Sequence, residues 1–328
     1  MNKTILAILK ILDKQQDIVG SREISRQLKQ HGIDITERTV RYHLKIMGDL
    51  GYAKVFGKEG RRITGKGQEE LQNALVTEKV GFIISKIETL SYQTTLDLGT
   101  FHGKIILNVS YLPKTDLKRA MKYLKPIFES PYVMSDRVLI KNEEERIGNV
   151  LIPKGMVGFG TVCSVTINGV LLKSGIPVTS RFGGVIEIKN GAPKRFLSLI
   201  SYEGSSLDPL EIFIKSKMTD VMGAVKNGSG KILASFREVP VICKKEIKLL
   251  VERLQENGMG GVLLIGKPNK PLLEIPVGMD KIGIVIIGGL NPIAAIEELG
   301  INTESKAMST LYDYSKLTHY KDIERGIR

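Results

Sequence analysis

The chain has 328 residues, of which 42% are hydrophobic and 25% are charged, a composition that supports folded cores and excludes a disordered polymer. At about 100–200 residues per domain, its length predicts two or three domains. Lys and Arg number 48 against 35 Asp and Glu, giving a net charge of +13, which favours a polyanionic partner such as nucleic acid. Trp is absent and aromatic residues make up only 6%, which argues against a stacking platform for single-stranded bases.

Several classes of protein are excluded by what the sequence lacks. Its two cysteines, Cys163 and Cys243, are too few for a disulfide scaffold, and its four histidines show no metal-ligand spacing. P-loop, nucleophile-elbow and HExxH motifs are absent, so we expect no enzyme, no catalytic residues, no metal and no cofactor. No apolar run reaches the roughly 18 residues of a membrane span, and the N-terminus does not resemble a secretion signal. We therefore expect a cytoplasmic protein.

Residues 1–75 have the pattern of three helices followed by a hairpin. Ser21 is expected to cap a second helix that ends near Gln30, and Thr36 a third that ends near Leu50, with Gly51 as its stop. The first helix is indicated by apolar residues at the spacing of one buried face: Ile5, Ile8, Leu9 and Leu12.

The third helix has one apolar and one basic face. At about 100° per residue, Val40, Leu44 and Met47 form a buried stripe. A basic face opposite such a stripe suits the major groove of DNA, where guanidinium groups bind guanine edges or phosphates. This face carries Arg38, Arg41, Tyr42 and Lys45.

Two β-like runs, 52–56 and 61–64, surround a Gly-bounded tip and predict a hairpin, or wing, that would lie on phosphates. A short helix over 66–75 would close the domain. Residues 36–66 contain eight Lys/Arg and three Asp/Glu, a net charge of +5, whereas the rest of 1–75 contains six of each. The alternative is the solvated basic face of a protein–protein module. The predicted DNA-binding residues are Ser21, Arg22, Thr36, Arg38, Thr39, Arg41, Tyr42, Lys45, Lys58, Arg61 and Arg62.

Three strings within residues 5–72 carry a resemblance to the ribonuclease-R-type winged-helix domain found at the N-terminus of some repressors. They are Ser21-Arg-Glu-Ile24, Thr36-Glu-Arg-Thr-Val-Arg-Tyr-His-Leu44 and Gly60-Arg-Arg-Ile-Thr64. The resemblance implies a winged helix-turn-helix fold that binds double-stranded DNA.

Residues 76–320 predict a larger mixed α/β domain, because β-branched runs alternate with helical patterns and Gly or Pro punctuation; residues 321–328 are expected to form a tail. Two related halves, about 100–225 and 226–300, are indicated by a near-repeat. It pairs Gly103–Leu107 with Gly230–Leu233, the helix Asp116–Lys125 with Lys244–Arg253, and two expected strands, Gly169–Leu172 and Gly261–Leu264. The first half is longer, chiefly through an expected insertion over Ser130–Phe159.

Three Gly-rich segments of this domain are candidates for ligand binding. One of them, Gly288–Pro292, follows the expected strand Ile282–Ile287 and would begin a helix, whose N-terminus favours anions. Gly155–Gly160 supplies backbone N–H groups before Thr161 and Cys163, and Thr179–Gly184 places Arg181 beside two hydroxyls. Arg is the best bidentate partner for a carboxylate. The predicted effector-binding residues are Gly158, Gly160, Thr161, Cys163, Thr179, Ser180, Arg181, Gly183 and Gly184.

Residues from about Lys79 to Leu317 resemble the regulatory domain of NrpR, a family of repressors of nitrogen-assimilation genes. The strings that carry this resemblance are Gly155–Ser164, Gly175–Val178, Ser201–Gly204 with Asp208-Pro209, Gly258–Gly261 and Gly288–Pro292. The resemblance implies that 2-oxoglutarate binds this domain and releases the repressor from its operator. Many members carry two copies of the domain, whereas this chain has room for one.

These observations together predict a homodimeric repressor that binds a palindromic operator, with a small-molecule effector as its ligand. Two other readings remain open. The chain could be a metabolite-binding protein or enzyme that uses the winged helix for assembly, or a corepressor that docks on the transcription machinery.

Overall fold

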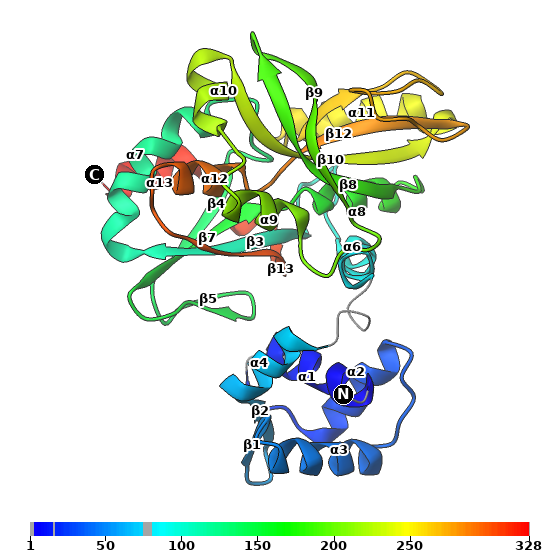
Figure 1. Ribbon diagram of the computed structural model, residues 1–328, viewed down its shortest axis with the longest axis vertical. Coiled ribbons are helices and arrows are strands. Elements are labelled where there is room, and N and C mark those ends of the chain that lie inside the picture. The colour runs from blue at the N-terminus through cyan, green and yellow to red at the C-terminus, as the bar shows by residue number, and fades with distance from the viewer. Residues whose placement is uncertain (1–2, 16, 75–80, 328) are drawn as a thin grey trace. The chain divides into compact units, whose positions relative to one another are not determined.

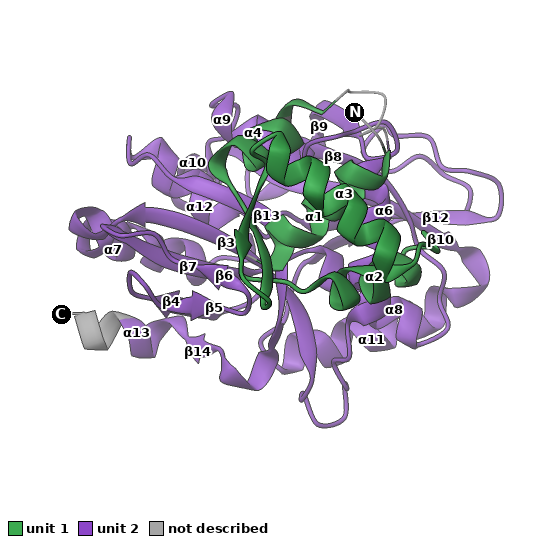
Figure 2. Ribbon diagram, turned by 90° about the horizontal axis from the view of Figure 1, so that it is seen from below, with its two compact units in different colours: residues 1–80 green, residues 81–328 purple. Residues whose placement is uncertain are grey.

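The computed structural model describes residues 3–15, 17–74 and 81–327, and the chain forms two compact units, 1–80 and 81–328 (Figures 1 and 2). Each unit has a hydrophobic core of its own and is described by itself. Within the described residues, no helix has the length and apolar character needed to cross a bilayer.

Unit 1 has the predicted order of three helices, a two-stranded hairpin and a closing helix. The apolar stripes of the first and third helices are buried, as predicted, and belong to one core. The hairpin pairs Phe56 with Gly60 around a three-residue tip. The elements are α1 Lys3–Gln15, α2 Ser21–Gln30, α3 Glu37–Asp49, β1 Ala53–Phe56, β2 Gly60–Ile63 and α4 Gly65–Asn73; the predicted last residue of the closing helix, Leu75, lies outside the described residues.

Of the two predicted N-cap residues, one is confirmed by the structure and the other is not. Thr36 caps α3 as predicted, because its hydroxyl accepts a hydrogen bond from the backbone N–H of Thr39. The prediction for Ser21 was wrong: Gly20 is the N-cap of α2, and the Ser21 hydroxyl instead donates to Glu37 at 2.9 Å.

Unit 2 contains two five-stranded sheets in which every described strand pair is antiparallel. The first has the order β13-β3-β7-β4-β14 and the second β11-β12-β10-β8-β9. The first comprises β3 Lys104–Pro113, β4 Arg137–Lys141, β7 Met156–Val162, β13 Glu304–Asp313 and β14 Thr318–His319; the second comprises β8 Thr179–Lys189, β9 Ala192–Ser201, β10 Gly230–Pro240, β11 Val262–Ile265 and β12 Lys281–Ile287.

Helices and a small hairpin complete unit 2 (Figure 1). The α-helices are α6 Phe82–Gln93, α7 Leu117–Phe128, α8 Val165–Lys173, α9 Pro209–Lys215, α10 Val221–Asn227, α11 Lys244–Glu256, α12 Asn291–Glu298 and α13 Tyr320–Ile327; the 3-10 helices are η1 Lys114–Asp116, η2 Val241–Cys243 and η3 Tyr314–Lys316; and the hairpin is β5 Arg146–Ile147 with β6 Val150–Leu151.

The internal repeat is real, and each copy gives its last strand to the sheet of the other. The order β3-η1-α7-β4-β7-α8-β8 recurs as β10-η2-α11-β11-β12-α12-β13. Strand β8 pairs with β10, and β13 pairs with β3. The two copies also share a turn, in which the N–H of Lys114 donates to Gly155 and that of Val241 donates to Asp280. This exchange of strands ties the two halves into a single unit.

Four expectations about this unit are corrected. Gly169–Leu172 lies in helix α8 and is no strand, so the counterpart of β11 is β4. The second copy extends past residue 300 because β13 belongs to it. The segment 142–155, which contains the β5–β6 hairpin, has a counterpart of similar length in 266–280. The first half is longer because β9, α9 and most of α10 follow β8 within it. The expected tail folds as α13, whose first residue, Tyr320, stacks on Phe128.

Candidate DNA-binding surface and effector pocket

Helix α3 presents the basic face that its sequence predicts. Val40, Leu44 and Met47 are buried on one side, at 0%, 3% and 0% exposure. Burial of that stripe turns the opposite side outward, and the four side chains predicted there are exposed: Arg38, Arg41, Tyr42 and Lys45. The helix therefore offers three cations and one phenol to a partner.

A groove of about 490 Å³ lies between the start of α2, helix α3 and the wing. It brings together five of the predicted DNA-binding residues and one acid, Glu37. Four of the five are cations, so the groove has the charge that a phosphate backbone requires. The five are Ser21, Arg22, Arg41, Lys58 and Arg61.

Arg41 is held in place by a small network at the entrance to α3. Its guanidinium forms an ion pair with Glu37, and its Nε donates to the Ser21 hydroxyl at 3.2 Å. The Ser21 hydroxyl and then Arg41 lower the pKa of the Glu37 carboxyl, so Glu37 stays ionised. The network orients Arg41 toward the groove and neutralises part of its charge.

The remaining predicted residues of this surface lie in two settings. The Thr36 and Thr39 hydroxyls are 3.0 Å apart and belong to the cap of α3. On the wing, Arg62 contacts Asp17 at 3.3 Å and lies over the Phe56 ring. These contacts fix the orientation of the side chains, which the sequence alone does not reveal.

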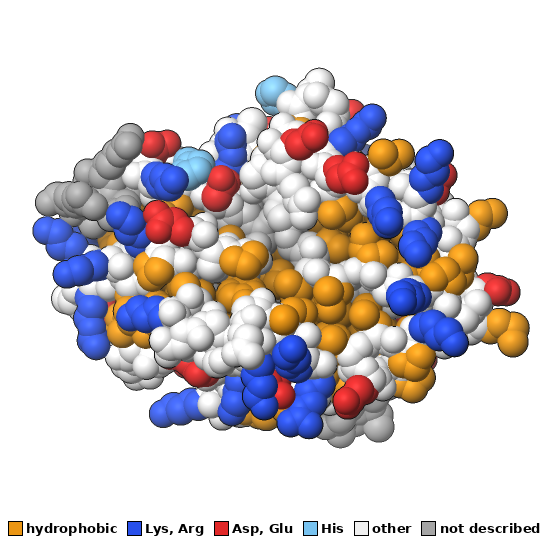
Figure 3. All heavy atoms as spheres, turned by 90° about the horizontal axis from the view of Figure 1, so that it is seen from above, with side chains coloured by type: hydrophobic (Ala, Val, Ile, Leu, Met, Phe, Trp, Pro, Cys, Tyr) orange, Lys and Arg blue, Asp and Glu red, His pale blue; other side chains and the backbone are white. Residues whose placement is uncertain are grey.

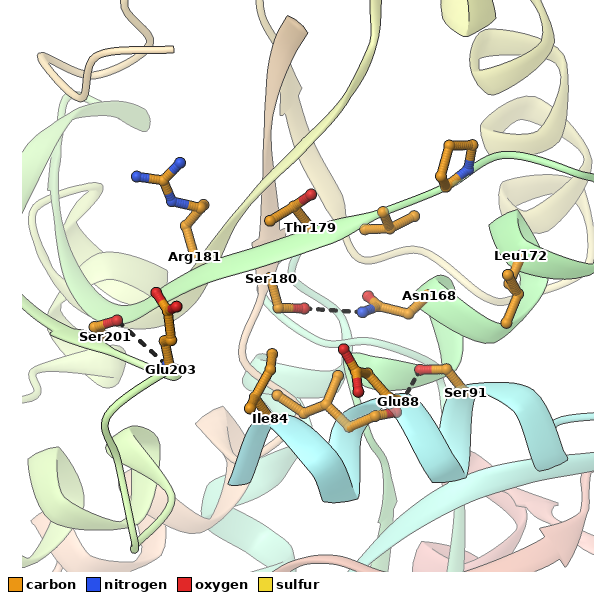
Figure 4. Close-up of a pocket in the computed structure, with 13 residues that line it drawn as sticks. Ile84, Glu88, Ser91, Asn168, Leu172, Thr179, Ser180, Arg181, Ser201 and Glu203 are labelled. Carbon is orange, nitrogen blue, oxygen red and sulfur yellow. Dashed lines mark hydrogen bonds between the residues drawn. The ribbon is translucent and has the colours of Figure 1, made fainter. Parts of the chain in front are cut away.

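Unit 2 has a pocket of about 540 Å³ at the start of β8 (Figure 4). Helix α6 supplies one wall through Ile84, Glu88 and neighbouring residues, and α8 contributes Asn168 and Leu172. The Ser180 hydroxyl and the Asn168 amide point toward each other and are joined by a hydrogen bond of 2.9 Å (Figure 4). The predicted effector residues among the lining are Thr179, Ser180 and Arg181.

The charges around this pocket are mixed. Arg181 is the only cation among the described residues that line it, and its Nη1 lies 3.1 Å from Glu238. Two carboxyl groups, those of Glu88 and Glu203, also line the pocket. An anionic ligand held by Arg181 alone would therefore compete with Glu238 and face two further acids.

Two predicted effector residues lie elsewhere, in the buried end of β7 and just after it. The Thr161 hydroxyl accepts a hydrogen bond from Asn108 at 3.4 Å. Cys163 is buried, which raises the pKa of its thiol to about 12, so the thiol stays protonated at neutral pH. Neither residue is among those that line the pocket.

The four predicted glycines lie inside strands, where neighbouring groups leave little room for a side chain. A Cβ atom at Gly158 would lie 2.2 Å from Ile152, and one at Gly160 would lie 3.2 Å from Leu139. At Gly183 and Gly184 the nearest groups belong to Pro209 and to the Ser198 carbonyl, at 2.7 and 2.5 Å. Close packing of this kind explains the glycines without a ligand.

The polar residues at or beside the pocket that sequence reasoning missed include Glu88, Asn168 and Arg237. Glu88 and Asn168 line it, whereas Arg237 is the register partner of Ser180 across the β8–β10 pair. A sequence signal existed only for Arg237, since a charged residue interrupts the apolar run of β10.

Comparison with known proteins agrees with this architecture. Residues 6–71 match the ribonuclease R winged-helix domain, and residues 80–319 match the NrpR regulatory domains NRD1 and 2. A global nitrogen regulator NrpRI of Methanosarcina mazei is 36% identical over 97% of this chain and 98% of its own. A nitrogen repressor-like protein of Methanococcus jannaschii has a solved structure that is 30% identical, with a TM-score of 0.62 over 73% of this chain and 98% of its own.

A longer relative also matches. The global nitrogen regulator NrpR of Methanococcus maripaludis is 33% identical over 94% of this chain, which spans 54% of that protein. A winged helix joined to such a domain defines a transcription regulator with an N-terminal DNA-binding module. Within that class, the chain belongs to the NrpR family.

Proposed function

We propose that this protein is a repressor of nitrogen-assimilation genes that binds its operator through unit 1 and releases it when 2-oxoglutarate binds unit 2. The observation that carries the DNA-binding part is the exposed basic face of α3 beside a groove lined by four cations. The names of the relatives, global nitrogen regulators, support the target genes.

The operator is expected to be read by α3 in the major groove while the wing contacts phosphates. Arg38, Arg41 and Lys45 are the side chains that reach base edges in this arrangement, and Lys58 with Arg62 positions the wing. Because sequence is read by base contacts, loss of Arg41 should reduce operator affinity more than affinity for random DNA.

The effector is expected to enter the pocket of unit 2, where Arg181 and the hydroxyls of Thr179 and Ser180 supply polar contacts. Binding there would favour an arrangement of the two winged helices that no longer matches the operator half-sites. By linkage, operator DNA must then weaken effector binding by the same factor.

A homodimer would bring two winged helices to a palindromic operator. Strand β9 supports this proposal because it is the edge of its sheet and exposes Leu197 and Leu199, each at 39%. Figure 3 shows apolar side chains gathered on one face of the molecule, with Lys and Arg around them. An exposed apolar edge strand favours pairing with another chain.

The test is operator binding by the full chain, measured with and without 2-oxoglutarate, for wild type and for Arg181→Ala. We expect specific binding that 2-oxoglutarate weakens, with a smaller effect in the variant. Sequence-independent binding would favour the reading in which the winged helix serves assembly, and unchanged effector affinity in the variant would remove Arg181 from the site.

A further inference from the structure

Arg237 is a fully buried cation for which the described residues supply no anion. It lies on β10 with 0% exposure, and its Nη2 donates to the Ser164 hydroxyl at 3.3 Å. Its Nε and Nη1 have no hydrogen-bond partner, and no carboxylate lies within 4.0 Å, among the residues that the structure describes. A buried charge without a counter-charge is strongly unfavourable. A bound anion would remove this cost, so the guanidinium is a candidate for binding an anionic ligand.

Arg237 lies beside the N-terminus of helix α8. Ser164 is the N-cap residue of α8, a helix of nine residues, and helix N-termini carry partial positive charge, although the N–H groups of Thr166 and Ile167 already donate to the carbonyls of Cys163 and Ser164. The guanidinium therefore faces a second feature that attracts anions. Arg237 and the start of α8 would both be stabilised by one anionic group between them.

A further buried polar atom without a hydrogen-bond partner among the described residues lies between Arg237 and the pocket. Asn168 lies one turn beyond Ser164 on α8, and its Oδ1 is buried without a partner in the described part of the chain. Asn168 Nδ2 donates to Ser180, which lines the pocket and is the register partner of Arg237 (Figure 4). Three of the five buried side-chain atoms that lack a partner within the described residues thus lie along this path.

The internal repeat shows that the fold itself does not need an arginine here. The pair Leu107–Val162 corresponds to Ala234–Ile287, and Pro113–Met156 corresponds to Pro240–Lys281. Counting along the strands makes Ser110 the counterpart of Arg237. Ser110 is satisfied by a hydrogen bond of 3.0 Å to Ser305, its own register partner in β13. In one copy, two serines at this position satisfy each other by a hydrogen bond. In the other copy, the long cationic side chain of Arg237 occupies the equivalent position.

We propose that Arg237, Ser164 and the first turn of α8 form a receptor for a carboxylate group of the effector, reached from the pocket by opening of the Asn168–Ser180 hydrogen bond. The planar guanidinium binds a carboxylate bidentately. Arg181, which also lines the pocket, would meet the other end of a dicarboxylate. The proposal rests on the proposed function in taking the effector to be a small dicarboxylic acid.

Two variants of the full chain test this receptor by calorimetry and thermal unfolding with 2-oxoglutarate. Arg237→Met keeps an unbranched apolar stem, shorter than that of Arg, and removes the charge. We expect the melting temperature without ligand to be at least that of wild type, no upward shift on adding 2-oxoglutarate, and about tenfold or greater loss of affinity. Lys226→Met, an exposed substitution on α10, is the matched control and should behave as wild type.

Ser164→Asp is the second variant, because its carboxylate would stand where the Ser164 hydroxyl meets Arg237. It supplies an internal anion, so we expect a raised melting temperature without ligand and no response to 2-oxoglutarate. This variant keeps the test decisive if Arg237→Met fails to fold. Unchanged affinity in either variant would overturn the receptor, as would a lowered melting temperature in Arg237→Met with ligand binding intact.

Failure of the receptor and failure of the proposed function give different results. If wild type ignores 2-oxoglutarate but succinate or glutarate stabilises it through Arg237, the named effector is wrong and the receptor stands. If 2-oxoglutarate binds through Arg237 without releasing the operator, the proposed regulation is wrong and the receptor stands. If none of these carboxylates raises the melting temperature of wild type, the receptor is overturned.

Discussion

At the scale of single residues, polar contacts rather than charge alone decide what each cation can do. Arg41 is tied to Glu37 and Ser21, Arg181 to Glu238, and Arg237 to a serine hydroxyl only. The first two are partly neutralised by carboxylates. Arg237 keeps an uncompensated charge, which is why it is the strongest candidate for binding an anion in unit 2.

Replacement of Arg41 by Ala should cost operator binding about 1–3 kcal/mol, a loss of about 5- to 150-fold in affinity at fixed salt. Part of that loss comes from Glu37, since its carboxylate would then face DNA without its ion-pair partner. Arg41→Ala combined with Glu37→Gln should therefore bind better than Arg41→Ala alone. Fluorescence anisotropy with operator and random duplexes measures both effects, and Lys29→Ala on α2 serves as control. Equal loss on the two duplexes would contradict a base-reading role.

Glu211 predicts a pH dependence of stability. Burial, and then the nearby Asp208 carboxylate, raise the pKa of Glu211 to about 7. The folded state therefore binds a proton more tightly than the unfolded state, whose carboxyl titrates near 4.5, and Glu211 lowers stability as pH rises from about 4.5 through 7. Glu211→Gln should remove this dependence and raise the free energy of unfolding at pH 8 by on the order of 2 kcal/mol. Denaturant unfolding at pH 5 and pH 8 measures the change, and parallel pH profiles for the two proteins would exclude it.

At the scale of elements, helix caps and edge strands set the geometry of both functional surfaces. The cap fixes where α3, the proposed recognition helix, begins, because the Thr36 hydroxyl accepts a hydrogen bond from the N–H of Thr39. Thr36→Ala should destabilise unit 1 by about 1 kcal/mol. Thr36→Ser keeps the hydroxyl and should stay near wild type. Thermal unfolding distinguishes them, and equal melting temperatures for all three proteins would mean that the cap contributes nothing.

The edge strand β9 carries the prediction about assembly. Leu197→Asp with Leu199→Asp places two charges on this exposed strand, so a dimer formed there should dissociate into monomers. Light scattering of the full chain measures the mass, and Lys194→Asp with Arg195→Asp, on the same strand, controls for added acid. A variant with Leu197→Asp and Leu199→Asp that stays dimeric would place the dimer interface elsewhere.

Sequence patterns predict elements well where one face is apolar and the other polar. The stripe of Val40, Leu44 and Met47 and the cap at Thr36 follow from local chemistry and were found in the structure. Helix α8 could not be told from a strand because Val170 and Leu171 are buried together with its polar residues, which removes the 3.6-residue period. The glycines of β7 and β8 suggested ligand contact, although they serve close packing against side chains and backbone far along the chain.

At the scale of the whole molecule, the two copies within unit 2 share one fold and differ in chemistry. Exchange of β8 and β13 makes each sheet depend on both halves, a long-range pairing that local patterns do not encode. The same symmetry shows that Arg237 breaks the correspondence between the two copies, because the equivalent position in the other copy holds a pair of hydrogen-bonded serines. Sequence comparison between the halves finds the repeat, but only the strand register aligns Ser110 with Arg237.

The central claim is that an operator-binding repressor is controlled by a carboxylate ligand. Its most direct test is fluorescence anisotropy of the full chain with a duplex selected from a random pool, at fixed salt, with and without 2-oxoglutarate. We predict preference for the selected duplex over random DNA and a tenfold or greater loss of that binding on adding 2-oxoglutarate. Equal binding of both duplexes, or operator binding that 2-oxoglutarate leaves unchanged, would contradict it.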